Sequence, residues 1–309
     1  MLAPTTAKHV EQQAQALAVA YGVPRVRVSL DFGRADRATV AIDERLSLGP
    51  LPFPDFHHPV GLPLDPLRPF ELGIDDHGHP VNLNMYGQHL LVGGIPGSGK
   101  SNALRVFLGH LAASRNVVLF GIDPKRVELT LWADRFTRLV VGNDAAETTQ
   151  LLEELHLEID RRTAHLSQTA QASLRPSAEF PWTVLVIDEW AEVAAGGTNK
   201  ERARADELLR RFVSLGRAVG CTAILCTQRP TSDVIDVGTR SLLGHRFALR
   251  CTDRYQAESI LGAGTYAPED LIGAEVGRVL WSDGGPARAF QFYEVADARV
   301  HGLTCSGYR

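Results

Sequence analysis

Residues 94–101 read GIPGSGKS, and this stretch decides the fold of the chain. It matches the phosphate-loop pattern G-x-x-x-x-G-K-[ST], with Gly94, Gly99, Lys100 and Ser101 at the fixed positions. The glycines let backbone N–H groups turn towards a triphosphate, the lysine reaches the outer phosphates, and the hydroxyl lies beside Mg²⁺. The alternative is a glycine-rich turn before a helix, in which the Lys-Ser pair has no role.

The residues on both sides of the loop favour phosphate binding. Residues 89–92, HLLV, predict a short buried strand, and residues 102–111 carry apolar side chains at helical spacing. The loop is therefore expected at the N-terminus of a helix, where free amides and the helix dipole favour an anion. The cofactors implied are ATP and Mg²⁺. The residues expected to contact the nucleotide are Gly94, Gly97, Ser98, Gly99, Lys100, Ser101 and Asn102.

The composition is that of an ordinary globular protein. The 309 residues are 44% hydrophobic and 22% charged, and no apolar run approaches the ~18 residues that cross a bilayer. The N-terminus lacks a signal-peptide pattern, so we expect a cytoplasmic protein that reaches a membrane only through a partner. A formal charge of −4 counts against a simple DNA-coating protein but does not exclude a ring that touches DNA phosphates along a narrow pore. The four cysteines lack metal-ligand spacing and are expected to be reduced structural thiols.

A proline-rich segment divides the chain. Before it, residues 6–21 predict an amphipathic helix, and residues 25–30 and 38–42 predict an antiparallel pair of strands. Residues 48–69 predict an extended linker because they are rich in proline. We therefore expect a small N-terminal α+β domain over residues 1–67 and a second domain over residues 68–309. The first domain could assemble a ring, contact DNA or simply pack against the second.

From residue 70 onwards short apolar strands alternate with helices. A hairpin is predicted over residues 70–83, with its turn at residues 75–78. Residues 168–179 predict a loop. This alternation is typical of an α/β fold with a mostly parallel sheet covered on both faces. Further strands are predicted at residues 117–122, 139–141, 184–187 and 222–227, and helices at residues 145–167 and 200–219.

An acidic pair follows one of the apolar strands. Residues 183–187 are an apolar strand, and Asp188 and Glu189 follow directly after it. This is the form of a Walker B element. Asp188 would hold the Mg²⁺ shell, and Glu189 would orient or activate the attacking water. Such a pair can also be only the charged start of a helix. Its position downstream of a phosphate loop, in an alternating fold, favours the catalytic interpretation.

Two further strands end in polar motifs. TQRP, residues 227–230, follows a strand whose carboxyl end would face a bound nucleotide. Gln228 could sense the γ-phosphate or position water there, whereas the alternative is a turn between strand and loop. DPK, residues 123–125, ends another strand. It is either a site element or a turn with a solvated lysine, and the sequence leaves both open.

These motifs, in this order, resemble a known family. The stretches LLVGGIPGSGKS, GIDPKRVELTLW, TVLVIDEWAE and GCTAILCTQRPTSDVI are similar to the motor domain of the FtsK/SpoIIIE family, in the HerA-FtsK group of P-loop ATPases. The resemblance covers most of residues 20–295, and the combination of the phosphate loop with DPK and TQRP is its most specific part. It implies a RecA-like α/β fold and a homo-hexameric ring that hydrolyses ATP between subunits while double-stranded DNA passes through the centre.

The resemblance also implies roles for individual residues. Lys100 and Ser101 would bind phosphate and Mg²⁺, and Asp188 would coordinate the metal shell. Glu189 would be the catalytic carboxylate and Gln228 the sensor.

A neighbouring subunit is expected to supply an arginine finger, because the transition state spreads negative charge over the phosphate oxygens. Arg217, in LGRAVG, is our first candidate. Arg210, Arg211 and Arg246 compete with it. Each of the four could also be an ordinary surface residue.

From this sequence we expect neither the N-terminal membrane segments of the septal pumps nor a winged-helix module after residue 295. In this the chain is similar to compact transfer proteins of actinobacterial plasmids and integrative elements. That similarity implies DNA transfer in conjugation, and chromosome partitioning is the other DNA process to consider. Two alternatives stay open, a type VII secretion-like ATPase that moves a protein, and a nucleotide-dependent assembly switch without sustained turnover.

Overall fold

A computed structural model describes residues 13–22, 25–30, 38–43, 64–228, 234–262, 271–285 and 287–296. The chain divides into two compact units, Met1–Pro52 and Phe53–Arg309. The domain boundary expected at residue 67 stays a prediction, because residues 44–63 lie outside the described ones.

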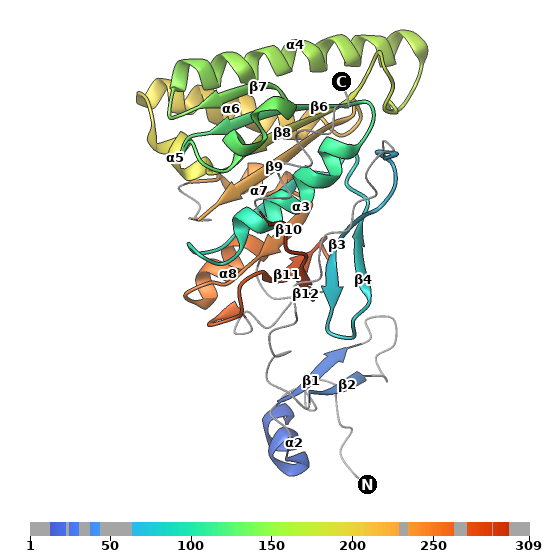
Figure 1. Cartoon of the computed structure of the whole chain (residues 1–309), viewed down its shortest axis with the longest axis vertical. Coiled ribbons are helices and arrows are strands. Elements are labelled where there is room, and N and C mark those ends of the chain that lie inside the picture. Colours follow the sequence, from blue (N-terminus) through green and yellow to red (C-terminus); the bar gives the residue numbers. More distant parts are fainter. Residues whose placement is uncertain are drawn as a thin grey trace. The chain divides into compact units, whose positions relative to one another are not determined.

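Among its described residues, the first unit contains helix α2 and a pair of strands (Figure 1). Helix α2 spans Ala14–Tyr21 and ends at Gly22, whose φ of +62° favours glycine. Strands β1 (Arg25–Leu30) and β2 (Ala38–Asp43) pair antiparallel. The predicted antiparallel pair is therefore confirmed, and so is the predicted helix from residue 14 onwards. Residues 6–12 of that helix lie outside the described residues.

The second unit is built on one ten-stranded sheet with the order β4-β3-β12-β11-β10-β5-β9-β8-β6-β7. Neighbours from β10 to β7 all run parallel, as the strand–helix alternation predicts. The remaining four strands form an antiparallel extension on the β10 side. Its hairpin β3–β4 was expected, whereas β11 and β12 were not. The strands are β3 (Phe70–Asp75), β4 (Pro80–Leu83), β5 (Leu90–Gly93), β6 (Val117–Asp123), β7 (Phe136–Val141), β8 (Trp182–Ile187), β9 (Cys221–Thr227), β10 (His245–Ala248), β11 (Arg278–Ser282) and β12 (Arg288–Phe292).

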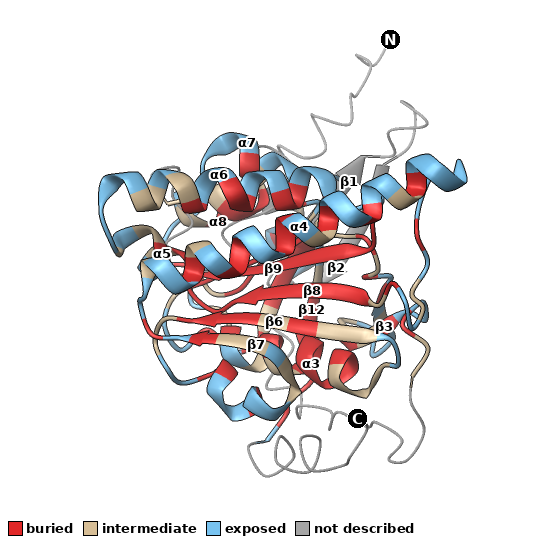
Figure 2. Ribbon diagram, turned by 90° about the horizontal axis from the view of Figure 1, so that it is seen from above, coloured by how far each residue is buried: buried red, intermediate tan, exposed pale blue. Residues whose placement is uncertain are grey.

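Helices cover both faces of the parallel strands (Figure 2). Helix α3 (Lys100–Ala113) and the 3₁₀ helix η1 (Leu129–Arg135) lie on one face. Helices α4 (Ala145–Thr169) and α6 (Asn199–Leu215) lie on the other. Three short helices also lie in the described part of the unit, α5 (Trp190–Ala195), α7 (Val237–Leu242) and α8 (Arg254–Leu261). In the described part of the chain, no helix has both the length and the apolar character needed to traverse a membrane.

Helix α6 is shorter than its sequence pattern suggests. It begins with a capping box in which Thr198 and Glu201 bond each other reciprocally. The prediction that it continues to residue 219 was wrong. The chain turns at Gly216, whose carbonyl accepts the Cys221 N–H at 2.9 Å, and Gly220 has a φ of +70°. These contacts end the helix at Leu215 and lead the chain directly into β9.

The core consists of two apolar clusters, one on each face of the sheet. Strands β8 and β9 are buried along their whole length, as their continuous apolar sequences require. On the α3 face, Phe107 packs edge-on against Phe292 of β12, with ring centroids 5.8 Å apart. Phe107 also packs edge-on against Phe247 of β10, with ring centroids 5.6 Å apart, so α3 contacts both the parallel strands and the antiparallel extension.

Three of the four cysteines lie in the described residues. Cys221, Cys226 and Cys251 are buried and free. Burial raises the pKa of the Cys221 thiol to about 12, so this thiol is unreactive at neutral pH. Cys305 lies outside the described residues.

Candidate active site

Residues 94–99 join β5 to α3, so the loop lies between a strand and a helix as predicted. Gly97 and Gly99 have φ values of +71° and +99°, which side chains other than glycine rarely adopt. A Cβ on Gly99 would also lie 2.6 Å from the backbone nitrogen of Gly277. Glycine is therefore required here for both conformation and space. Contact of the loop with a nucleotide stays a prediction.

Two segments distant in sequence hold this loop from outside. The Arg250 carbonyl accepts the Ile95 N–H at 3.0 Å, and the Gly277 N–H donates to the Ser98 carbonyl at 2.9 Å. The Arg250 guanidinium donates to the Gly97 carbonyl at 2.9 Å. Sequence reasoning missed Arg250, because an arginine after a short strand carries no signal of its own. The shape of the loop is thus supported by residues outside the motif.

Lys100 leaves the first turn of α3 towards the end of β8. Its ammonium donates to the Asp188 carbonyl at 3.1 Å and to Glu189 Oε2 at 3.2 Å. The Lys100 and Glu189 side chains are 7% and 2% exposed, so little water screens this pair. The structure therefore brings together the lysine of the phosphate loop and both carboxylate residues of the predicted Walker B element.

Glu189 is held by groups from three other segments. The Gln228 N–H donates to both of its carboxylate oxygens, at 3.0 and 3.1 Å. Lys125 Nζ lies 3.2 Å from Oε2, the oxygen that also contacts Lys100. Burial alone would raise the pKa of Glu189, but Lys100, Gln228 and Lys125 together hold this pKa below its ordinary value. Glu189 is therefore an anion at neutral pH, as a general base that activates water must be.

Asp188 fits the metal-binding role that its sequence position suggests. Its Oδ1 is buried and has no hydrogen-bond partner within the described residues. Burial raises the pKa of Asp188, opposed by Lys100, and the carboxylates of Asp123 and Glu189 raise it further. Such a group favours a cation close by. The exposed Ser101 lies in the first turn of α3.

No three acidic, histidine or cysteine side chains gather as a metal cluster within the described residues. A Mg²⁺ ion needs no such cluster, because it is commonly bound by one or two carboxylates together with substrate phosphates. Asp188 and Ser101 therefore fit Mg²⁺ bound with a nucleotide.

The structure separates the two roles left open for the DPK motif. The fully buried Asp123 organises the chain, because its Oδ2 accepts from the Leu129 and Thr130 N–H groups at 3.0 and 3.1 Å and thereby starts η1. Lys125 instead reaches into the site and contacts Glu189. The motif therefore supplies one residue that shapes the turn and one that belongs to the site.

Asn102 makes contacts that its sequence position did not suggest. Its side-chain amide donates to the Tyr293 carbonyl at 2.5 Å and its Oδ1 accepts the Val295 N–H at 2.8 Å. Both functional groups of this side chain therefore tie α3 to the segment that follows β12. Its predicted contact with the nucleotide stays untested.

The four arginine candidates do not reach the phosphate loop of their own chain. Arg217 is exposed in the turn between α6 and β9, at the amino ends of the parallel strands, whereas the loop lies at their carboxyl ends. Arg210 and Arg211 are exposed on α6. Arg246 is half-buried and donates to the carbonyls of Leu243 and Arg240, at 3.0 and 2.9 Å. The assignment of an arginine finger therefore stays a prediction about a neighbouring subunit.

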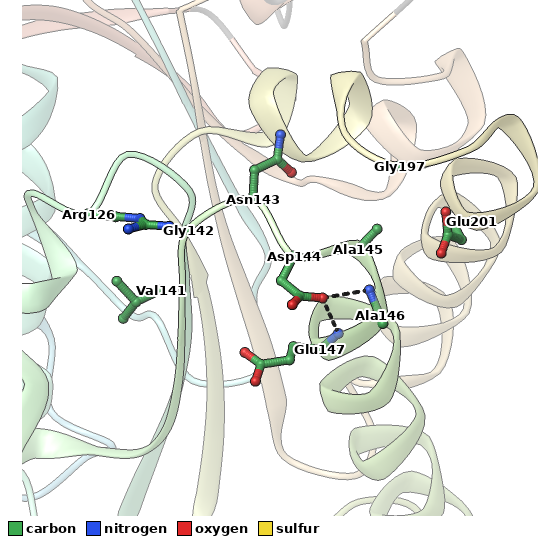
Figure 3. Close-up of a pocket in the computed structure, with 10 residues that line it drawn as sticks. All are labelled: Arg126, Val141, Gly142, Asn143, Asp144, Ala145, Ala146, Glu147, Gly197 and Glu201. Atoms are coloured by element: carbon green, nitrogen blue, oxygen red, sulfur yellow. Dashed lines mark hydrogen bonds between the residues drawn. The ribbon is translucent and has the colours of Figure 1, made fainter.

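A polar hollow of about 570 Å³ opens beside the DPK turn (Figure 3). Two of its three acidic side chains cap helices, since Asp144 accepts from two N–H groups of α4 and Glu201 bonds Thr198. We therefore treat the hollow as part of the surface beside the site. It is lined by Arg126, Val141, Gly142, Asn143, Asp144, Ala145, Ala146, Glu147, Gly197 and Glu201.

Solved structures confirm the fold. The pCW3 conjugation coupling protein TcpA, in its monomer form with ATPγS, has a TM-score of 0.69 at 19% identity, covering 96% of this chain and 85% of TcpA. EssC from Geobacillus thermodenitrificans (ATPases 2 and 3) has a TM-score of 0.68 at 15% identity, covering 84% of this chain and 51% of that one. The second unit therefore has the α/β fold of P-loop ATPases.

Sequence relatives identify the family. The DNA translocase FtsK of Helicobacter pylori (strain J99) is 31% identical over 216 residues, which cover 65% of this chain and 25% of the relative. That of Treponema pallidum (strain Nichols) is 31% identical over 224 residues, covering 67% of this chain and 26% of the relative. The chain thus spans about a quarter of the length of these relatives. Residues 64–180, which include the phosphate loop and the DPK turn, match the model of the FtsK/SpoIIIE family. The chain therefore contains a domain of the FtsK/SpoIIIE family.

Proposed function

We propose that this chain is an ATP-hydrolysing translocase of double-stranded DNA that works as a homo-hexameric ring in conjugative DNA transfer or chromosome partitioning. The observation that carries the proposal is the meeting of Lys100 and Glu189, 3.2 Å apart at the carboxyl ends of the parallel strands. The relatives named DNA translocase FtsK support DNA as the substrate. TcpA, a conjugation coupling protein with the same fold, supports DNA transfer as the process.

Each residue of the site has a role in this proposal. The amides of residues 94–101 and the Lys100 ammonium bind the phosphates of ATP. Ser101 and Asp188 would hold Mg²⁺, which would supply positive charge beside the phosphate oxygens. Glu189 orients the attacking water and accepts its proton, and Gln228 is the sensor beside it. The backbone bond from Gln228 to Glu189 supports this pairing.

A neighbouring subunit supplies the arginine finger, which is a further positive charge at the phosphates. Arg217 is our candidate because it is exposed and, within the described residues, forms no ion pair. It lies at the amino ends of the parallel strands, whereas the phosphate loop lies at their carboxyl ends. A head-to-tail ring would therefore bring the Arg217 of one subunit towards the loop of the next.

The test is steady-state ATP hydrolysis with and without linear duplex DNA, at several salt concentrations. We expect DNA to stimulate turnover and salt to weaken the stimulation, because contacts with DNA phosphates release counterions. Lys100→Ala should abolish turnover through lost phosphate binding. Glu189→Gln should lower kcat by about 10²- to 10⁴-fold, the usual contribution of a general base.

Other outcomes would replace the proposal. Turnover that ignores DNA but responds to a secreted peptide would indicate an ATPase that moves a protein. A protein that assembles with ATP but does not turn it over would indicate an assembly switch.

A further inference from the structure

Lys125 lies in the turn after β6, and several hydrogen bonds fix the backbone of this turn. The Asp123 carbonyl accepts the N–H groups of Arg126 at 3.2 Å and Gly142 at 2.8 Å. The buried Asp123 carboxylate accepts the Leu129 N–H at 3.0 Å on the far side of the turn. Because both ends are fixed, the Lys125 side chain leaves the turn from a defined place.

The Lys125 side chain reaches Glu189. Its Nζ lies 3.2 Å from Oε2, and the two side chains are 32% and 2% exposed. Within the part of the chain that the structure describes, this is the only ion pair that Lys125 forms. A charge pair between two exposed side chains contributes little, but here one partner is almost fully buried, so its orientation depends on the groups around it.

Glu189 has a second lysine partner, Lys100, but the two lysines are not equivalent. Lys100 belongs to the phosphate loop, and in the proposed function its charge serves the phosphates of ATP. Lys125 lies outside the loop, 64 residues from Glu189 in sequence. Lys125 at the end of β6 and the Gln228 N–H at the end of β9 approach the carboxylate from the two strands that flank β8. Both contacts come from outside the phosphate loop.

We propose that Lys125 is a positioning residue that holds Glu189 in the orientation needed to direct water at the γ-phosphate. Lys125 acts through Glu189 and does not bind the nucleotide. The inference rests on the proposed ATP hydrolysis and adds a residue to the same site. Without the ammonium, the carboxylate loses its support from the β6 side and can shift, and a misplacement of about 1 Å can lower a rate by about 100-fold.

The test compares Lys125→Met, which keeps the length of the side chain and removes its charge, with Lys125→Arg, which keeps a charge. Under Mg²⁺-ATP and duplex DNA, Lys125→Met should lower kcat by about 10- to 100-fold and leave KM for ATP within about twofold. Lys125→Arg should recover most of the turnover. Lys200→Met, the same change at an exposed position on α6, should leave kcat unchanged.

A binding measurement separates positioning from phosphate binding. In a Glu189→Gln background, adding Lys125→Met should leave the Kd of a fluorescent ATP analogue unchanged. A tenfold rise in Kd would overturn the inference, because Lys125 would then bind the nucleotide directly. Circular dichroism checks folding, and Lys125→Gln is a second uncharged variant should Lys125→Met unfold.

The kinetic outcomes separate this inference from the proposed function. Wild-type turnover with unchanged kcat in the uncharged variants would overturn the role of Lys125 and leave the ATPase proposal intact. A wild-type protein without ATP turnover would overturn both.

Discussion

His89 immediately precedes β5, and its ring is only 1% exposed. The ring nitrogen Nδ1 accepts the Ala223 N–H at 3.0 Å, which links the residue before β5 to β9. Burial, together with the positive charge of nearby Arg217, lowers the pKa of His89 from 6.5 to about 4. Folded His89 is therefore neutral in a pH range where the unfolded chain takes up a proton. Protonation thus favours unfolding below about pH 6.5.

This shift predicts a specific dependence of stability on pH. Above pH 6.5, neutral His89 makes its full contribution to the free energy of unfolding. As the pH falls from 6.5 to 4, this free energy decreases by about 3 kcal/mol. His89→Asn keeps an acceptor for the Ala223 N–H but does not titrate. Urea unfolding at pH 7 and pH 5 should therefore show a smaller loss for His89→Asn than for wild type. Equal losses of stability in the two proteins would mean that folding does not lower the pKa of His89.

At the scale of elements, α4 shows how local capping supports the site. This helix covers one face of the parallel strands (Figure 2). Its N-terminus lines the same hollow as Arg126, the residue that follows DPK (Figure 3). Asp144 accepts the N–H groups of Ala146 at 3.0 Å and Glu147 at 2.9 Å, so two otherwise unpaired donors of the first turn are satisfied. The helix therefore has a defined start next to the segment that positions Lys125.

Removing this cap should destabilise the fold without changing the chemistry of the site. We expect Asp144→Ala to lower the free energy of unfolding by about 1 kcal/mol, measured by urea denaturation. Asp144→Asn is the matched control, because asparagine caps helices as well as aspartate does, and it should cost clearly less. If both variants lose the same stability, the charge of Asp144 matters more than its capping bonds.

At the scale of the whole molecule, the phosphate loop and Arg217 lie at opposite edges of the parallel sheet. Lys100, Asp188 and Glu189 all lie at the carboxyl ends of the strands, whereas Arg217 precedes β9 at the amino ends. One chain cannot therefore bring both sets of groups to one nucleotide. In the proposed ring, each active site combines residues of two subunits.

Shared sites predict complementation between inactive variants. Lys100→Ala removes the phosphate lysine, and Arg217→Ala removes the proposed finger, so each alone should be nearly inactive. A mixture should recover part of the activity, because some interfaces pair an intact loop with an intact Arg217. The measurement is ATPase rate against the ratio of the two variants. A mixture no more active than its components would remove Arg217 as the finger, and Arg210 and Arg211 would be tested in the same way.

Much of the site could be predicted because its motifs are local. The phosphate loop needs glycines at fixed spacing in one short segment, and Asp188 and Glu189 follow a strand that is apolar throughout. Parallel strands then bring their carboxyl ends to one edge, so the meeting of Lys100 with Glu189 follows from the alternation of strands and helices. Local pattern and sheet direction together were sufficient for these residues.

The remaining contacts depended on tertiary structure. Lys125 was ambiguous in the sequence, since only the fold shows that its turn lies beside the end of β8. Arg250 and Gly277 support the phosphate loop from segments more than 150 residues further along the chain, and neither carries a motif. The sequence by itself determined the loop, the acidic pair and the parallel α/β core, because short-range spacing encodes them. The tertiary structure decided which distant residues hold them in place, because such contacts arise only when strands separated in sequence become neighbours in the sheet.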